Sequence, residues 1–168
     1  MNTSITYTIH GLTSLHEFLG DFVVYRNLIP ADGRLPSVDE LREDLGLDGN
    51  TLPRKAEPDY GRVVAEMLRR ARALDRPRIA IKRLIYIGDT WMNDGTAFRN
   101  LCAAGEWPGW AFIGRDEMHR PPRVEVESAL YLTNRWSALP DFLQFVEGQG
   151  FALDEATAVV IDVDKTAI

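Results

Sequence analysis

Four aspartates stand in two short segments, and their clustering is the strongest chemical signal in the sequence. Asp89 and Asp94 belong to the segment Gly-Asp-Thr-Trp-Met-Asn-Asp, and Asp162 and Asp164 are two residues apart in a later segment. Residues two apart in an extended chain direct their side chains to the same side. Carboxylates packed together repel one another unless a cation, a proton or hydrogen-bond donors compensate. The clustering therefore indicates that a cation, a proton or hydrogen-bond donors lie beside each segment.

Each segment also has a purely structural interpretation. Asp94 would cap the helix that follows it, and Asp89 would hold the preceding loop. Asp162 and Asp164 would be solvated residues of a polar terminal segment. These alternatives stay open at the level of the sequence.

Both acidic segments directly follow a continuous apolar run, at residues 84–87 and 157–161. Such runs are typical of strands that are covered on both faces, as in parallel sheets. In open α/β sheets, ligands bind beyond the carboxyl ends of the strands. The position of the aspartates therefore favours a ligand site as much as their chemical type does.

The surrounding pattern predicts strands that alternate with helices. Ser37 and Glu40 form a capping box, which indicates the start of a short helix before Gly46. The expected strands are 4–9, 84–87, 110–113, 129–132 and 157–161, and the expected helices are 14–24, 37–45, 59–75, 95–104 and 139–147. This alternation predicts a three-layer α/β domain over residues 1–168, with an open, mostly parallel sheet and helices on both faces.

Composition narrows the class of protein. The formal net charge of −6 argues against a general nucleic-acid binder, which needs a basic face. The apolar runs are too short to span a bilayer, and we find no export signal. Cys102 is the single cysteine, so no intramolecular disulfide can form. We expect a cytoplasmic protein that binds neither nucleic acid nor membrane.

The motifs resemble those of the haloacid dehalogenase-like (HAD-like) hydrolase superfamily. Asp162-x-Asp164-x-Thr166 after an apolar strand looks like the first motif of that superfamily. The segment from Gly88 to Asp94 looks like its fourth motif, and Lys55, which precedes a helix, looks like the lysine of its third. The resemblance covers about residues 50–168.

The resemblance implies an Mg²⁺-dependent phosphohydrolase that acts through an aspartyl-phosphate intermediate. Asp162 would attack the phosphoryl group, and Asp164 would protonate the leaving oxygen and later activate water. The further implied roles are Lys55 and Thr8 as catalytic residues, Thr166, Thr90 and Asn93 as substrate-binding residues, and Asp162, Asp164, Asp89 and Asp94 as metal ligands. We therefore expect the carboxylates of Asp89 and Asp162 to lie about 3–5 Å apart, within one Mg²⁺ shell.

The order of the motifs departs from the superfamily, in which the nucleophile motif comes first. A circular permutation would place the last strand, 157–161, in the centre of the sheet beside strand 84–87. The strand that contains Thr8 would then be its other neighbour, and Thr133-Asn134 is an alternative source of the second-motif hydroxyl. Alternatively, the chain is the N-terminal piece of a longer protein, or it shares only the fold with the superfamily.

The expected partner is a small phosphorylated molecule. Because no segment follows the first motif in the printed sequence, a lid over the site would come from residues 9–50, from a second copy of the chain or from a second module. Two other functions stay open. One is a catalytically weak or inactive binding or assembly module, with Trp91, Trp107, Trp110 and Trp136 as a contact surface. The other is a receiver-type phosphoacceptor, which would not need Asp164 as an acid and base.

Overall fold

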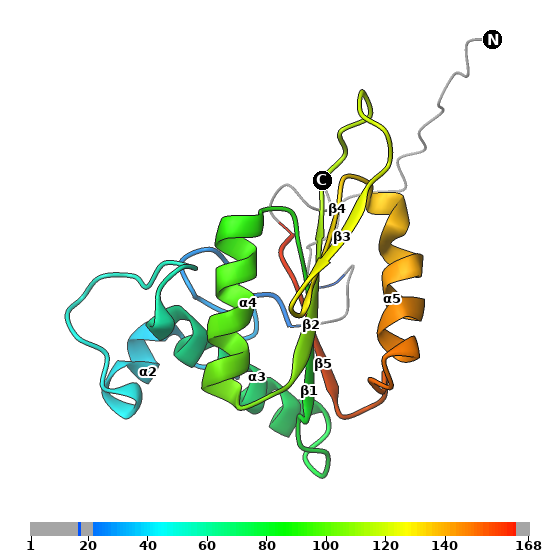
Figure 1. Ribbon diagram of the computed structural model, residues 1–168. Helices are drawn as coiled ribbons and strands as arrows, with labels where there is room; N and C mark the ends of the chain where they lie inside the picture. Colours follow the sequence, from blue (N-terminus) through cyan, green and yellow to red (C-terminus); the bar gives the residue numbers. More distant parts are fainter. Residues whose placement is uncertain (1–16, 18–21, 164–168) are drawn as a thin grey trace.

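A five-stranded sheet forms the centre of the molecule, with helices against both of its faces (Figure 1). The computed structural model describes Glu17 and residues 22–163. In chain order the elements are α2 (Val38–Leu45), α3 (Pro58–Asp75), β1 (Arg83–Gly88), α4 (Trp91–Gly105), β2 (Gly109–Gly114), β3 (Val124–Glu127), β4 (Leu130–Thr133), the short 3₁₀ helix η1 (Trp136–Ala138), α5 (Leu139–Gly148) and β5 (Thr157–Ile161). The predicted α/β class is confirmed, and the arrangement is consistent with a Rossmann-like fold.

The strand order is β3-β4-β2-β1-β5, and every neighbouring pair is parallel except β3 and β4. The two strands that precede the acidic segments, β1 and β5, are direct neighbours, with Ile87 opposite Ile161. Within the described residues β5 is an edge strand rather than a central one. The predicted strand 4–9, which would flank it, lies outside the described residues.

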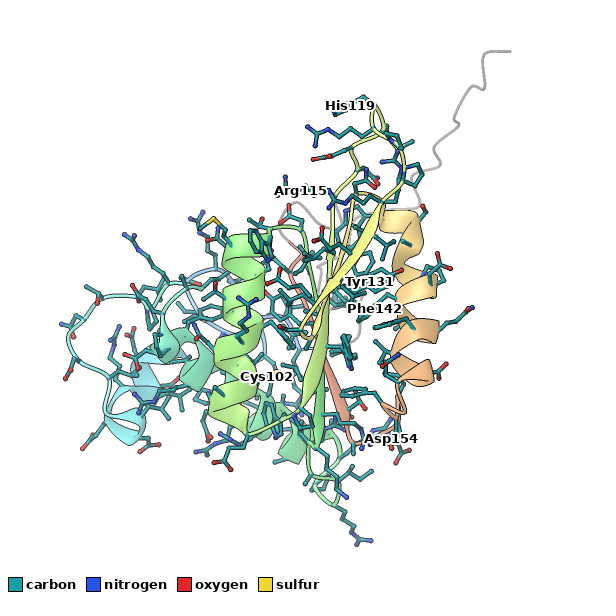
Figure 2. The ribbon with its side chains drawn as sticks, in the orientation of Figure 1. Cys102, Arg115, His119, Tyr131, Phe142 and Asp154 are labelled. Carbon is teal, nitrogen blue, oxygen red and sulfur yellow. The ribbon has the colours of Figure 1, made fainter. Side chains whose placement is uncertain are left out.

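Side-chain alternation along β1 divides the core between the two faces of the sheet. Tyr86 packs on the side of α3 and α4, whereas Ile85 and Ile87 pack on the side of α5. Figure 2 shows Phe142 of α5 directed toward the sheet, where it belongs to the second of these clusters. The unbroken burial of β1 from Leu84 to Gly88 confirms the prediction of a strand covered on both faces.

A close contact between α3 and α4 sets the positions of the loops that precede them. A side chain at Gly61 would put its Cβ 2.6 Å from the backbone of Asn100, so only glycine permits this approach. Upstream, the predicted capping box of Ser37 and Glu40 is confirmed, and Gly46 ends α2 in the left-handed conformation. Among the described residues, no helix is both long and apolar enough to cross a membrane.

Two of the predicted helices differ from the structure by more than one residue at a boundary. The helix expected at residues 95–104 begins at Trp91, because Thr90 is its N-cap and Asp94 lies inside the first turn. Of the helix expected over residues 14–24, the structure describes Glu17, which is helical, and residues 22–24, which are not. Val24 instead forms an isolated bridge with Pro30.

One strand, β3, was not among the strands expected from the sequence. All four of its residues are exposed, so its apolar side chains have no buried face to mark them as a strand. The turn at Ser128, which has a φ of 56°, returns the chain so that β3 pairs with β4. This strand depends on its hairpin partner and not on burial.

Candidate functional site

Lys55 joins two aspartates that are far from it in the sequence. Its ammonium group donates to Asp94 Oδ1 at 2.8 Å and to Asp162 Oδ2 at 2.6 Å. The three residues come from the turn before α3, the first turn of α4 and the residue after β5. These contacts span 39 and 107 positions of the chain. The fold therefore assembles the site at the carboxyl ends of β1 and β5, where ligands bind in open α/β sheets.

Asp94 is almost completely buried, with 1% of its surface exposed. Its Oδ1 accepts from Lys55 Nζ and from the Tyr86 hydroxyl, and its Oδ2 accepts from the backbone N–H groups of Asp89 and Thr90. Four donors satisfy this carboxylate, which also gains from its place at the start of α4. Asp94 thus fixes Lys55 relative to the loop between β1 and α4.

Gly88 makes this burial possible. A Cβ at this position would lie 2.7 Å from both Cβ and Cγ of Asp94, which is far too close for any side chain. The glycine therefore leaves the space in which the Asp94 carboxylate packs against the end of β1. Its role is steric, since its backbone has no positive φ.

Asp89 and Asp162 complete an acidic group with Asp94. One carboxylate oxygen of each lies within 4.8 Å of those of the other two. The backbone N–H of Asp162 donates to Ile87 O at 2.9 Å, which extends the β1–β5 ladder and holds Asp162 beside the end of β1. The Thr90 hydroxyl donates to Asp89 Oδ1 at 2.6 Å. The proximity of Asp89 and Asp162 that the sequence predicts is therefore present.

The electrostatic balance differs among the three linked groups. Burial alone would lower the pKa of Lys55, but its hydrogen bonds to Asp162 and Asp94 raise it. Burial alone would raise the pKa of Asp94, but the hydrogen bond and charge of Lys55, together with the hydrogen bonds from Thr90 and Tyr86, lower it. Burial raises the pKa of Asp162, and repulsion from Asp94 and Asp89 adds to this despite Lys55. Of the two carboxylates that bind Lys55, Asp162 is the one whose charged form is disfavoured.

Two tyrosines at the site were not predicted from the sequence. Tyr86 donates to Asp94, and burial strongly raises the pKa of its hydroxyl, so it is a neutral donor. Tyr60 of α3 is half-buried within electrostatic range of Lys55, and burial raises the pKa of its hydroxyl as well. The signal for Tyr86 was a single polar atom within an apolar strand, which is equally typical of a core tyrosine.

The other residues predicted for the site differ in where they lie. Thr90 lies at the site, where its hydroxyl and backbone contact the two aspartates of the loop. Asn93 is an exposed residue of the first turn of α4. Thr8, Asp164 and Thr166 lie outside the described residues.

Thr133 and Asn134 do not belong to this site. Thr133 is the last residue of β4 and Asn134 follows it, and β2 and β1 separate this strand from β5. The Thr133 hydroxyl accepts from the Arg135 backbone, and the Asn134 side chain binds backbone groups of Arg123 and Pro121. They hold the neighbouring loop instead.

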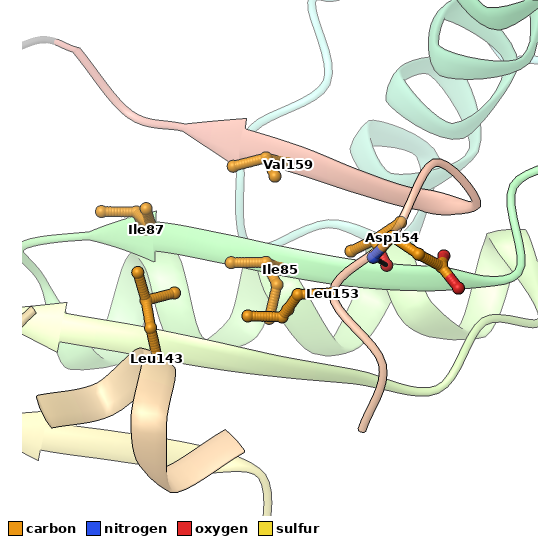
Figure 3. Close-up of a pocket in the computed structure, with 7 residues that line it drawn as sticks. Ile85, Ile87, Leu143, Leu153, Asp154 and Val159 are labelled. Carbon is orange, nitrogen blue, oxygen red and sulfur yellow. Dashed lines mark hydrogen bonds between the residues drawn. The ribbon is translucent and has the colours of Figure 1, made fainter. Parts of the chain in front are cut away.

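An apolar groove of about 290 Å³ lies on the opposite face of the sheet, between α5 and β5 (Figure 3). Its lining includes Ile85, Val159 and Leu143, together with Asp154 near the start of β5. Asp154 is paired with Arg83 at 2.6 Å. None of the clustered aspartates lines this groove, so it is separate from the Lys55 site.

The four tryptophans do not form a common surface. Trp107 is buried, and Trp110 and Trp136 pack against the cluster on the α5 side. Trp91 at the start of α4 is the exposed one, with 47% of its surface accessible. The contact surface considered from the sequence is therefore not present.

Comparisons of the chain with protein-family models, with curated proteins and with solved structures gave no match.

Proposed function

We propose that this chain is an Mg²⁺-dependent phosphohydrolase of HAD-like type, acting through an aspartyl-phosphate on a small phosphorylated molecule. The observation that carries the proposal is the bridge from Lys55 to Asp94 and Asp162. It unites the three residues that resemble the third, fourth and first motifs of that superfamily, although they stand in a different order in the chain. The permuted order is then compatible with one assembled site.

Asp162 is the proposed nucleophile. Its Oδ2 accepts from Lys55, whereas its Oδ1 has no hydrogen-bond partner among the described residues. A carboxylate oxygen of Asp162 would attack phosphorus as the bond to the leaving oxygen breaks, and water would then displace the carboxylate to release phosphate. Asp164 is the proposed donor of the proton to the leaving oxygen and the later base toward water. Lys55 would compensate charge on the phosphoryl oxygens.

The donor set fits a hard divalent cation. Three carboxylates meet within 4.8 Å, and Lys55 is the cation that hydrogen-bonds to two of them. Because four donors already satisfy Asp94, we assign the metal chiefly to Asp89 and Asp162, with Asp94 as the residue that positions Lys55. A bound Mg²⁺ would supply charge stabilisation for the phosphoryl oxygens.

The test is hydrolysis of p-nitrophenyl phosphate by wild type and by Asp162→Asn, with and without Mg²⁺. We expect Mg²⁺-dependent turnover that falls by at least about a thousandfold in the variant, because the nucleophile is lost. Glu155→Gln is the matched control, since Glu155 is an exposed carboxylate near the opposite end of β5. The control should retain wild-type turnover.

Turnover that persists in Asp162→Asn, or that does not depend on metal, would contradict the proposal. Absence of turnover in wild type, with Mg²⁺ binding that is lost in Asp162→Asn, would favour a non-catalytic binding module. The receiver-type alternative predicts a stable phosphorylated Asp162 that Asp164→Asn leaves unchanged. In the phosphohydrolase, Asp164→Asn would slow the loss of that phosphoryl group.

A further inference from the structure

An arginine stands at the tip of the strand next to β1. Gly88 of β1 is opposite Ile113 of β2, so Arg115 lies two residues beyond that pair, at the same edge of the sheet as Asp89. Figure 2 shows Arg115 at the base of the loop that rises from this edge, with His119 at the tip. Two strand spacings, about 10 Å, separate the β2 and β5 backbones. A substrate bound at Asp162 could therefore reach this arginine.

The side chain of Arg115 is directed to the same face of the sheet as Asp162. The Arg115 backbone N–H donates to Thr133 O at 3.2 Å, so this residue continues the β2–β4 ladder and keeps its alternation. Along β2, Ile113 packs on the α3 and α4 side, and Arg115 is two residues further. Along β5, Ala158 packs on that side, and Asp162 is four residues further. Both side chains thus belong to the face that carries Lys55.

The loop that follows Arg115 is held by several hydrogen bonds. The Arg135 guanidinium donates to the carbonyl oxygens of Glu117, Arg120 and Asn134. The Asn134 side chain accepts from the backbone of Arg123. The backbone of Arg115 is therefore anchored at both sides, and its position does not depend on its own side chain.

Arg115 is also the least neutralised arginine of this loop. Its guanidinium is 3.8 Å from Glu117, which lies closer to Arg120 at 3.1 Å. Arg123 is paired with Glu125 at 2.7 Å. The Arg115 side chain is 58% exposed. A guanidinium with one long contact is available to bind an anion in a bidentate manner.

We infer that Arg115 binds a second anionic group of the substrate, either a carboxylate or a further phosphate, while the reacting phosphoryl group lies at Asp162. This inference rests on the proposed function and specifies its substrate class. It makes Arg115 a specificity-determining residue that contacts the organic part of the substrate. Arg115 would not strengthen the binding of phosphate monoesters whose organic part is uncharged.

The test compares wild type, Arg115→Gln and the matched control Arg120→Gln in Mg²⁺. The substrates are phenyl phosphate, 4-carboxyphenyl phosphate and hydroquinone bisphosphate. We expect Arg115→Gln to lower kcat/KM roughly tenfold or more for the substrates with a second anion, mainly through KM, because a charge-assisted hydrogen bond is lost. Phenyl phosphate and the control should change less than about twofold. The two anionic substrates show which anion Arg115 prefers.

Binding of phenylphosphonate and 4-carboxyphenylphosphonate, measured by calorimetry, separates this inference from the proposed function. If wild type binds the carboxylated phosphonate more tightly and Arg115→Gln removes the preference, the inference holds even without turnover. Equal losses on charged and uncharged ligands, equal effects in Arg120→Gln, or no preference in wild type would each overturn it. Loss of turnover alone would count against the proposed function and not against Arg115.

Discussion

The two acidic segments of the site are built differently. In the segment from Gly88 to Asp94, strand, loop and helix enclose a carboxylate that four donors satisfy. Asp162, in contrast, follows a strand whose pairing in the described residues is with β1 alone, and its Oδ1 has no partner there. Burial raises the pKa of Asp162, whereas Lys55 lowers that of Asp94. The first segment is therefore a scaffold that positions Lys55, whereas Asp162 is the carboxylate with fewer hydrogen bonds.

Removing the scaffold carboxylate should give the largest effect on stability. Asp94→Asn leaves Lys55 and two backbone N–H groups facing an amide, so we expect a loss of about 3–5 kcal/mol in the free energy of unfolding at neutral pH. Urea denaturation measures it, with Asp141→Asn, an exposed residue of the first turn of α5, as the control.

The sign of the pH dependence follows from the lowered pKa of Asp94. Its stabilising effect is present above the unfolded pKa of 3.8 and is lost as pH falls toward the lower folded pKa. The difference between wild type and Asp94→Asn should therefore shrink below about pH 4. If the difference in the free energy of unfolding between wild type and Asp94→Asn is constant with pH, the charge of Asp94 does not stabilise the fold.

Filling the space beside the Asp94 carboxylate should give a smaller loss of stability. Gly88→Ala puts a methyl group 2.7 Å from Asp94 Cβ and Cγ, and the carboxylate must move. We expect a loss of about 1–3 kcal/mol in stability and weaker Mg²⁺ binding, because Asp89 moves with the loop. Gly33→Ala is the control, since nothing lies within 4 Å of its Cβ position. Wild-type stability in Gly88→Ala would mean that the loop adapts without strain.

The smallest effect, with the opposite sign, is expected at Asp162. Because its folded pKa is raised, its neutral form favours folding below the unfolded pKa of 3.8, and this contribution is lost as pH rises through the folded pKa. Asp162→Asn should therefore match wild type at low pH and be more stable than wild type at pH 7. Thermal unfolding across this range measures it. A destabilised variant at pH 7 would make Asp162 a structural residue like Asp94.

Sequence reasoning identified the parts of the site that depend on local pattern. The apolar runs predicted β1 and β5, and the segments after them predicted that Asp89 and Asp162 would meet. Lys55 was found through its resemblance to a motif before a helix, and its contacts place it beside Asp94 and Asp162, while its catalytic role stays a prediction.

What the sequence could not provide depends on three-dimensional contacts. Asp94 was predicted as a metal ligand or a helix cap, but its four donors become visible only once α4 is known to begin at Trp91. Tyr86 has the pattern of a core residue, and only the packing of α4 on β1 directs its hydroxyl to Asp94. β3 lacks a buried face, so no alternation of apolar and polar residues marked it as a strand.

The position of Asp162 in the chain also has a consequence for the order of assembly. A chain under synthesis that has produced β1 and α4 already contains Lys55, Tyr86 and Asp94, so the first of the two Lys55 contacts can form early. The second closes a separation of 107 residues and must wait for β5 to add to β1. Because such distant contacts form only after the loop between them has been ordered, Asp162 joins Lys55 and Asp94 last. An incompletely synthesised chain would thus hold Lys55 and the scaffold but not Asp162.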